Sequence, residues 1–181
     1  MNTNKNLLIL GAGQYGKVAK EVAESMDCFE KIAFLDDNND LAIGKLDEYE
    51  KFSLEYTYAF VAIGKADLRL SYIQRLKEAC FRVAVLFSPK SYVSPSAKLM
   101  NGTIIEPMAV VNAGSTVNAG VYVCAGAIVN HNAVVGEGCQ LDCGSVVGSN
   151  AVLPAGTKLK YNEVWDKDRA EKSLALSAKQ Q

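Results

Sequence analysis

The chain has 181 residues, enough for one large domain or two small ones, and a formal net charge of −1 at pH 7. Basic and acidic residues balance and no block of like charges occurs, so we expect neither nucleic acid nor an anionic membrane as a partner. Five cysteines without a CxxC pair predict reduced thiols in a cytoplasmic protein, with no disulfide framework and no metal site. The apolar run at residues 7–10 is too short for a signal peptide or a membrane span.

The first part of the chain alternates between strand and helix patterns. Residues 6–10 form a buried-strand run, a glycine-rich turn follows at residues 11–16, and apolar residues then recur on one helical face. Further strands are expected over residues 31–35 and 58–63, a helix over 66–80 and a short strand over 82–86. The alternation predicts a small doubly wound α/β domain of the Rossmann type, which we assign to residues 1–87.

The glycine turn has the spacing GxGxxG at Gly11, Gly13 and Gly16, and Asp36 follows about 20 residues later. This is the fingerprint of a dinucleotide site, where amides at a helix N-terminus bind phosphate and the carboxylate binds ribose hydroxyls. A domain of this size supplies only one of the two mononucleotide-binding halves, so we expect a mononucleotide such as UDP. The alternative is that the glycines serve only the close packing of helix on strand.

The second part of the chain is a repeat of six residues. Neither the helical period of 3.6 nor the strand period of 2 stays in phase with this spacing, so each unit must be a very short strand and a corner. Gly is frequent three residues after each repeated aliphatic, as suits a tight corner. We predict a parallel β-helix over residues 88–165 and a tail over 166–181; a purely structural solenoid is the plain alternative. The repeated aliphatics are Val93, Leu99, Ile105, Val111, Val117, Val123, Val129, Val135, Leu141, Val147, Leu153 and Leu159.

These motifs resemble the nucleotide-sugar acetyltransferases of the PglD and NeuD type, within the hexapeptide-repeat acyltransferase superfamily. The likeness covers residues 5–157 and is carried by LGAGQYG at 10–16, FLDD at 34–37, AIG at 62–64 with Arg69, and SPSA at 94–97. It implies a left-handed β-helix that binds acetyl-CoA, a first domain that binds a UDP-sugar, and a homotrimer. By this resemblance the nucleotide sugar is bound by Gly11, Gly13, Tyr15, Asp36, Asp37, Ile63 and Gly64, with Tyr15 at a position where His is common.

His131 is the only histidine, two residues after Val129 and therefore at a corner of the repeat, pointing away from the packed interior. A lone histidine is usually an ordinary surface or core residue. The resemblance, however, places the catalytic histidine of the family at this corner. Imidazole suits removal of a proton from a sugar amine that attacks a thioester. The resemblance also implies an oxyanion donor one coil further on, at Gly148 and Ser149.

Three positions depart from the family pattern. Asn132 stands directly after His131, where an acid is usual, although Asn can still orient the ring. Gln140 stands where a second histidine is common, and Cys124 and Ala125 replace a frequent Asn-Thr pair. These departures keep open the alternative of a non-catalytic nucleotide-sugar-binding or scaffold protein.

Two other classes fit the repeat less well. A prism carbonic anhydrase needs three histidine ligands, and the chain has one. A sugar nucleotidyltransferase would carry a basic signature after the glycine turn, which is missing. The sequence therefore predicts an acetyl-CoA-dependent acyltransferase that acetylates an amino or hydroxyl group of a UDP-amino-sugar for surface glycan synthesis, with His131, Asn132 and Ser149 as catalytic residues.

Overall fold

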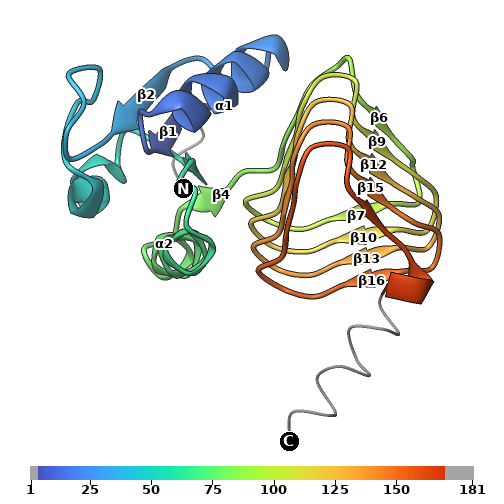
Figure 1. Ribbon diagram of the computed structural model, residues 1–181. Coiled ribbons are helices and arrows are strands. Elements are labelled where there is room, and N and C mark those ends of the chain that lie inside the picture. The colour runs from blue at the N-terminus through green and yellow to red at the C-terminus, as the bar shows by residue number, and fades with distance from the viewer. Residues whose placement is uncertain (1–3, 170–181) are drawn as a thin grey trace, which may run out of the picture.

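The computed structural model describes residues 4–169 and shows two domains side by side (Figure 1). The first has a parallel sheet of order β2-β1-β3-β4. Its strands are β1 (Leu7–Leu10), β2 (Ile32–Leu35), β3 (Tyr58–Val61) and β4 (Arg82–Val83). Its helices are α1 (Gln14–Ser25), the 3₁₀ helix η1 (Leu46–Phe52) and α2 (Ala66–Glu78). None of the helices within the described residues is long and apolar enough to span a membrane.

The sheet is buried on both faces, as a doubly wound domain requires. Alternate residues of a strand point to opposite faces, and in β1 they enter two separate cores. Leu7 and Ile9 pack with Val22 of α1, whereas Leu8 and Leu10 pack with the residues of α2 and η1. The two helices therefore cover opposite faces of the sheet, which confirms the predicted α/β architecture.

The second domain is a triangular prism of two-residue parallel strands. One side, here called face I, contains β5, β8, β11, β14 and β17; face II contains β6, β9, β12, β15 and β18; face III contains β7, β10, β13 and β16. Each strand pairs with the strand 18 residues away, as Ile128 does with Val110 and Val146. Three hexads thus make one coil, and the predicted parallel β-helix is confirmed. The strands are β5 (Leu86–Phe87), β6 (Tyr92–Val93), β7 (Lys98–Leu99), β8 (Ile104–Ile105), β9 (Val110–Val111), β10 (Thr116–Val117), β11 (Tyr122–Val123), β12 (Ile128–Val129), β13 (Val134–Val135), β14 (Gln140–Leu141), β15 (Val146–Val147), β16 (Val152–Leu153), β17 (Lys158–Leu159) and β18 (Val164–Trp165).

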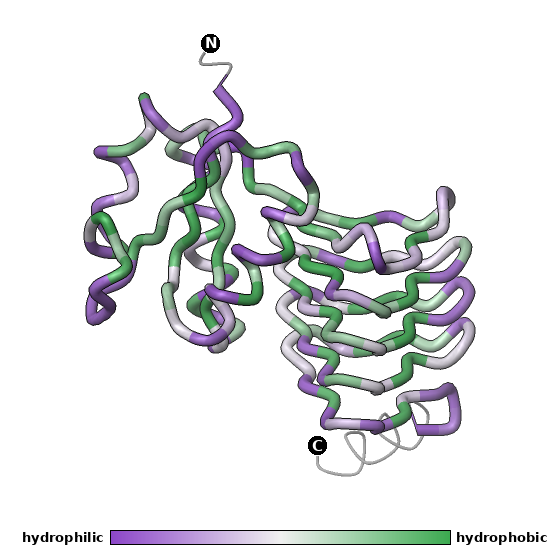
Figure 2. Tube along the Cα trace, turned by 90° about the horizontal axis from the view of Figure 1, so that it is seen from above, coloured by the Kyte–Doolittle hydropathy of each residue, from purple (hydrophilic) through white to green (hydrophobic). Residues whose placement is uncertain are grey.

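The hexad period follows from which residue of each strand points inward. The second residue of the strand is the repeated aliphatic, and from Ile105 to Leu159 every one of these residues is fully buried. They stack from coil to coil, so that apolar positions recur in columns along the prism (Figure 2). At the corner between faces II and III, Gly114 and Asn132 occupy equivalent positions with φ of +70° and +55°. Glycine and asparagine tolerate this left-handed backbone best.

The prism is longer by one strand at each end than the aliphatic pattern predicts. The inward column continues as Phe87 and Trp165, six residues before Val93 and after Leu159, but both residues are aromatic. Trp165 is buried in the prism core and its Nε1 donates a hydrogen bond to the Val152 carbonyl at 3.0 Å. Trp165 therefore packs at the end of the prism, where a solenoid needs a cap.

The boundary between the domains lies within the short strand expected over residues 82–86. The structure divides that segment into β4, which joins the first sheet, and β5, which joins face I of the prism. The prism therefore begins at Leu86, two residues before the boundary expected at 87/88. Of the expected tail over 166–181, residues 170–181 lie outside the described residues.

The first domain docks on face I. The outward residues of this face are Leu86, Ile104 and Tyr122 in its first three strands, and all three are fully buried. The next two outward residues are Gln140 and Lys158, which are polar and stay accessible to solvent. The polarity of this column thus changes where the cover of the first domain ends.

Candidate active site

Four glycines belong to the expected nucleotide site or to its glycine-rich turn, and they are of two structural types. They are Gly11, Gly13, Gly16 and Gly64. A Cβ atom on Gly11 would lie 2.7 Å from the Ala62 carbonyl oxygen, and one on Gly16 would lie 2.1 Å from the Gly11 carbonyl oxygen. The close approach of these backbones excludes a side chain at both positions, and Gly11 also has a φ of +105°, which favours glycine. A Cβ atom on Gly13 or on Gly64 would have no atom within 4 Å. Since β1 lies between β2 and β3 at the switch point of the sheet, the open backbone of Gly13 and Gly64 is where a ligand would approach.

Asp36 lies beside the glycine turn. Its Oδ2 accepts a hydrogen bond from the Ala12 amide at 2.8 Å, and its Oδ1 accepts one from the Asn38 amide at 2.9 Å. The Asp37 carboxylate instead accepts a hydrogen bond from the Leu46 amide at the start of η1, at 3.1 Å. Of the two acids, Asp36 is therefore the one positioned next to the turn, and it also holds the turn in place.

Tyr15, in the first turn of α1, points toward the prism. Its ring stacks on Tyr122, with centroids 4.1 Å apart and an angle of 9° between the planes. Its hydroxyl donates to Glu106 Oε1 at 3.0 Å and lies 3.3 Å from Cys124 Sγ. Burial above all, and then the neighbouring Cys124 and Glu106 groups, raise the pKa of Tyr15, so the phenol stays protonated. A sugar that touches Tyr15 would lie against the corner between faces I and II.

Glu106 is a buried carboxylate that sequence reasoning did not single out. Its Oε2 accepts a hydrogen bond from the Ala125 amide at 3.0 Å, so it links two coils as well as two domains. A signal was available in the 18-residue register, because Glu106, Cys124 and Asp142 occupy the same corner column. Without the knowledge that the first domain covers face I, that column had no evident partner.

We expect the thiol of Cys124 to be protected from alkylation. Burial, more than the nearby Glu106 charge, raises its pKa to about 12, and burial also raises the pKa of Cys139. The thiolate is the reactive form, so at pH 8 iodoacetamide should modify the exposed Cys28 and Cys80 quickly while Cys124 and Cys139 remain unmodified. Mass spectrometry of tryptic peptides measures this. The raised pKa means that the Cys124 thiolate is less favourable in the folded protein than in the unfolded one. Protection of the thiol and stability of the fold should therefore persist below about pH 9 and be lost as the pH rises toward 12. Labelling of Cys124 as fast as Cys28 in the native protein would contradict this assignment.

His131 is exposed at the corner between faces II and III. Its amide donates to Asn130 Oδ1 at 3.1 Å and its carbonyl accepts from the Asn150 amide at 2.8 Å. Ser149 lies one coil further along at the same corner, because Val129 pairs with Val147 and Val134 with Val152. Paired strands lie about 4.8 Å apart, so the Ser149 amide is placed beside the His131 backbone.

The two candidate oxyanion donors differ in availability. The Gly148 amide donates to the Trp165 carbonyl at 2.7 Å and is therefore occupied by the prism ladder. Within residues 4–169, no hydrogen bond from the Ser149 amide is found. The geometry thus favours Ser149 over Gly148 as a donor to a ligand.

Asn132 has the contacts of a corner residue. Its Nδ2 donates to Asn150 Oδ1 at 3.4 Å, and its Oδ1 lies 2.3 Å from where a Cβ atom on Gly114 would be. The side chain therefore lies along the column of the corner, bonded to Asn150. Asn130, which sequence reasoning missed, is the asparagine that fixes the backbone of His131, and it continues a ladder from Asn112.

The two groups of predicted site residues lie at different places in one chain. The glycine turn, Asp36 and Tyr15 lie beside face I and the corner between faces I and II, whereas His131 and Ser149 lie at the far edge of face II. In Figure 1 the corner that joins the β12 face to the β13 face points away from the first domain. A single chain does not bring the nucleotide-binding residues and His131 together.

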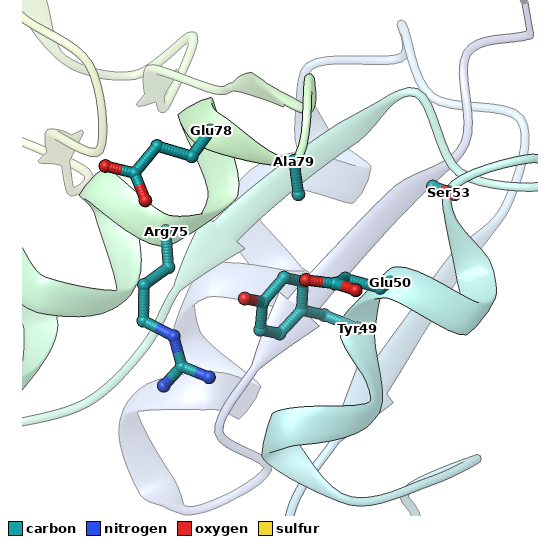
Figure 3. A pocket seen from close by; sticks show the side chains of 6 residues that line it. All are labelled: Tyr49, Glu50, Ser53, Arg75, Glu78 and Ala79. Atoms are coloured by element: carbon teal, nitrogen blue, oxygen red, sulfur yellow. The ribbon is translucent and has the colours of Figure 1, made fainter.

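A separate surface pocket lies between η1 and α2 and contains none of the predicted site residues (Figure 3). Within it the Arg75 guanidinium lies over the Tyr49 ring, 5.3 Å from its centroid, and forms an ion pair of 2.8 Å with Asp47. The pocket is lined by Tyr49, Glu50, Ser53, Arg75, Glu78 and Ala79.

Comparison with known proteins finds similarity both to the first domain alone and to most of the chain. Residues 6–76 match the family model described as the PglD N-terminal domain. Among solved structures, the acetyltransferase domain of PglB from Neisseria gonorrhoeae FA1090 is similar over 91% of this chain and 98% of that one, with 24% identity and a TM-score of 0.61. The same domain in complex with acetyl coenzyme A matches with 25% identity, 91% and 97% coverage, and a TM-score of 0.59. PerB from Caulobacter crescentus, in complex with CoA and GDP-perosamine, matches with 20% identity, 88% and 90% coverage, and a TM-score of 0.61.

The fold and these matches define the class: the chain is a left-handed parallel β-helix of hexapeptide repeats preceded by an α/β domain, the architecture that it shares with these sugar acetyltransferases. Its first domain is of the PglD N-terminal type, and the resemblance to the PglD- and NeuD-type sugar acetyltransferases is confirmed.

Proposed function

We propose that this protein transfers the acetyl group of acetyl-CoA to an amino group of a UDP-linked amino sugar, in the synthesis of a surface glycan. The observation that carries the proposal is the pairing of an exposed imidazole, His131, with the Ser149 amide one coil away, in a chain that also has an open glycine turn for a nucleotide. The similar structures support the choice of substrates, since the PglB domain is in complex with acetyl coenzyme A and PerB with CoA and GDP-perosamine.

In the proposed reaction the sugar nitrogen attacks the thioester carbonyl, the new bond is N–C, and the C–S bond to CoA breaks. His131 removes the proton from the nitrogen as the tetrahedral intermediate forms, and this proton then neutralises the CoA thiolate. The oxyanion of the intermediate accepts a hydrogen bond from the Ser149 amide. No side chain of the protein becomes acetylated, so the cysteines have no part in the chemistry.

We further propose that the active protein is a homotrimer, because face II is apolar on its outer surface. Its outward residues are Tyr92, Val110, Ile128, Val146 and Val164, of which Tyr92 and Val164 are 56% and 50% exposed. On face I the outward residues are apolar only where the first domain covers them. By the same physical reasoning, a wholly apolar outer column on face II favours a cover by another copy of the chain.

A threefold arrangement with face II toward the axis also assembles the site. Three parallel prisms packed closely around this axis cover the outward residues of face II, and they bring the corner between faces II and III of one copy beside the corner between faces I and II of the next. Cys124 and His131 are seven residues apart within the same coil, and rotation about a parallel axis keeps their height. His131 of one copy would then stand beside Tyr15 and Cys124 of its neighbour, which supplies the nucleotide.

The direct test is an acetyl-transfer assay of the purified chain with acetyl-CoA and a panel of UDP-, dTDP-, CMP- and GDP-linked amino sugars. The reaction is measured by the free CoA thiol that it releases. A parallel thermal-shift panel reports binding, because a ligand that binds only the folded state raises its stability. We expect binding and transfer with a UDP-linked sugar. Binding of both ligands without transfer would support the non-catalytic alternative, and transfer to another nucleotide sugar would correct the nucleotide alone.

Replacement of Asp36 by alanine should weaken UDP binding by about 1.5 to 3 kcal/mol, or roughly ten- to a hundredfold, because a charge-assisted hydrogen bond to the ribose is lost. Calorimetric titration measures this. Since Asp36 also bonds the Ala12 amide, Asp36→Asn serves as the matched variant that keeps an acceptor for the turn but removes the charge. Unchanged affinity for UDP in Asp36→Ala, with tight binding of NAD, would show that the mononucleotide assignment is wrong.

A further inference from the structure

Arg69, in α2, is a fully buried cation at the junction of the two domains, with 1% of its surface exposed. Within the described residues it forms no ion pair with a carboxylate; its partners are backbone carbonyls and an aromatic ring. Nε donates to the Gly120 carbonyl at 2.8 Å and Nη2 to the Gly138 carbonyl at 2.7 Å. Nη1 donates to the carbonyls of Ile63 at 2.7 Å and Gly64 at 3.0 Å.

These four carbonyls belong to two structures that otherwise have separate roles. Gly120 and Gly138 lie at the prism corner between faces III and I, on successive coils. Ile63 and Gly64 form the loop that leaves β3 at the carboxyl edge of the sheet, where the nucleotide is expected. The guanidinium is thus the connection between the prism and one wall of the nucleotide site.

Tyr122 of face I strengthens the same connection. Its ring lies 4.1 Å from Cζ of Arg69, and its hydroxyl donates to the Val61 carbonyl at 2.6 Å. Arg69 and Tyr122 together therefore bind the carbonyls of Val61, Ile63 and Gly64, at and just after the end of β3. The Cα of Gly64 faces open space on its other side, since a Cβ atom there would meet nothing within 4 Å.

We propose that Arg69 is a positioning residue for the nucleotide: it holds the loop of residues 63–64 against the prism and so keeps the wall of the nucleotide site open. This inference rests on the proposed function. The planar guanidinium has five donors in a fixed fork, which is why one side chain reaches carbonyls in three directions. An ammonium group is a compact point charge and cannot span the loop and both coils at once.

The test compares Arg69→Lys, which keeps the charge, with Tyr122→Phe, which keeps the ring beneath the guanidinium but loses the bond to the Val61 carbonyl. Binding of UDP and of GDP to the full-length chain is measured by calorimetric titration at a temperature where circular dichroism shows each variant folded. KM values for the nucleotide sugar and for acetyl-CoA are measured separately. Arg75→Met is the matched control, because Arg75 is on the same helix but belongs to the surface pocket of Figure 3.

We expect Arg69→Lys to weaken binding of the nucleotide at least tenfold and to raise KM for the nucleotide sugar, while KM for acetyl-CoA changes less than twofold. Tyr122→Phe should have a smaller effect of the same kind, and Arg75→Met none. Wild-type affinity in Arg69→Lys, or an equal rise of both KM values, would overturn the positioning role while leaving the proposed function intact. A wild-type protein that binds none of UDP, dTDP, CMP and GDP would overturn both.

Discussion

Replacement of His131 by alanine should lower the rate of acetyl transfer about 10²- to 10⁴-fold, which is the usual range for loss of a general base. Affinity for acetyl-CoA and for nucleotide should stay nearly unchanged, because the imidazole acts on the proton in transit and not on either bound ground state. The ring is exposed within its own chain, so the substitution removes no packing from the core of the prism. Steady-state rates and direct titrations of the two ligands measure the effect.

The control for this substitution is Glu137→Gln, at an exposed corner between faces III and I on the same stretch of the prism. This substitution changes a titratable side chain at another corner and leaves the residues around His131 unaltered. The rate of acetyl transfer by this variant should match that of the wild type. If His131→Ala retained near-full acetylation of a UDP-amino-sugar, the base would have to be another group.

Replacement of Ile128 by aspartate should dissociate the trimer. Ile128 is the central outward residue of face II, between Val110 and Val146. In a separate chain the aspartate would be hydrated at little cost, but between two copies it would be a buried, unpaired charge that costs about 3 to 5 kcal/mol. Light scattering after size-exclusion chromatography should change from three times the chain mass of 19.5 kDa to that mass. Acetyl transfer should fall with it, because the site needs residues of two copies.

Thr116→Asp on face III is the matched control for Ile128→Asp, since Thr116 is the outward residue of an equivalent two-residue strand. This variant should remain trimeric. A wild-type protein that is monomeric at micromolar concentration would contradict the assembly before any variant is made.

The prism could be predicted almost completely because its period is local. From Val93 to Leu159 every inward position is an aliphatic residue, so the pattern alone predicts the strands in that range. The aliphatic pattern does not mark β5 and β18, because Phe87 and Trp165 occupy the inward register position there with aromatic residues, although the predicted bounds of 88–165 already included Trp165. The first sheet was predicted for a similar reason, since its strands are buried on both faces and appear as continuous apolar runs.

The contacts between domains could not be predicted in the same way. Tyr15 and Glu106 are 91 residues apart, and neither residue type by itself indicates a partner. The four groups that Arg69 binds are backbone carbonyls, so no side chain at those positions indicates the contact. What the sequence did contain was the change from Tyr122 to Gln140 along the outer column of face I, which becomes informative only once the 18-residue register is known.

The 18-residue coil sets a rule for how this protein can tolerate insertions and deletions. Adding or removing a whole coil preserves which corner every later residue occupies and changes only its height. An insertion of six residues would instead advance all later hexads by one face, so that the column containing Ala113 and His131 would be continued at another corner. Length variation before His131 should therefore be accepted in steps of 18 residues. A single hexad inserted between His131 and Ser149 would keep the fold of the prism, but it would separate the imidazole from the Ser149 amide.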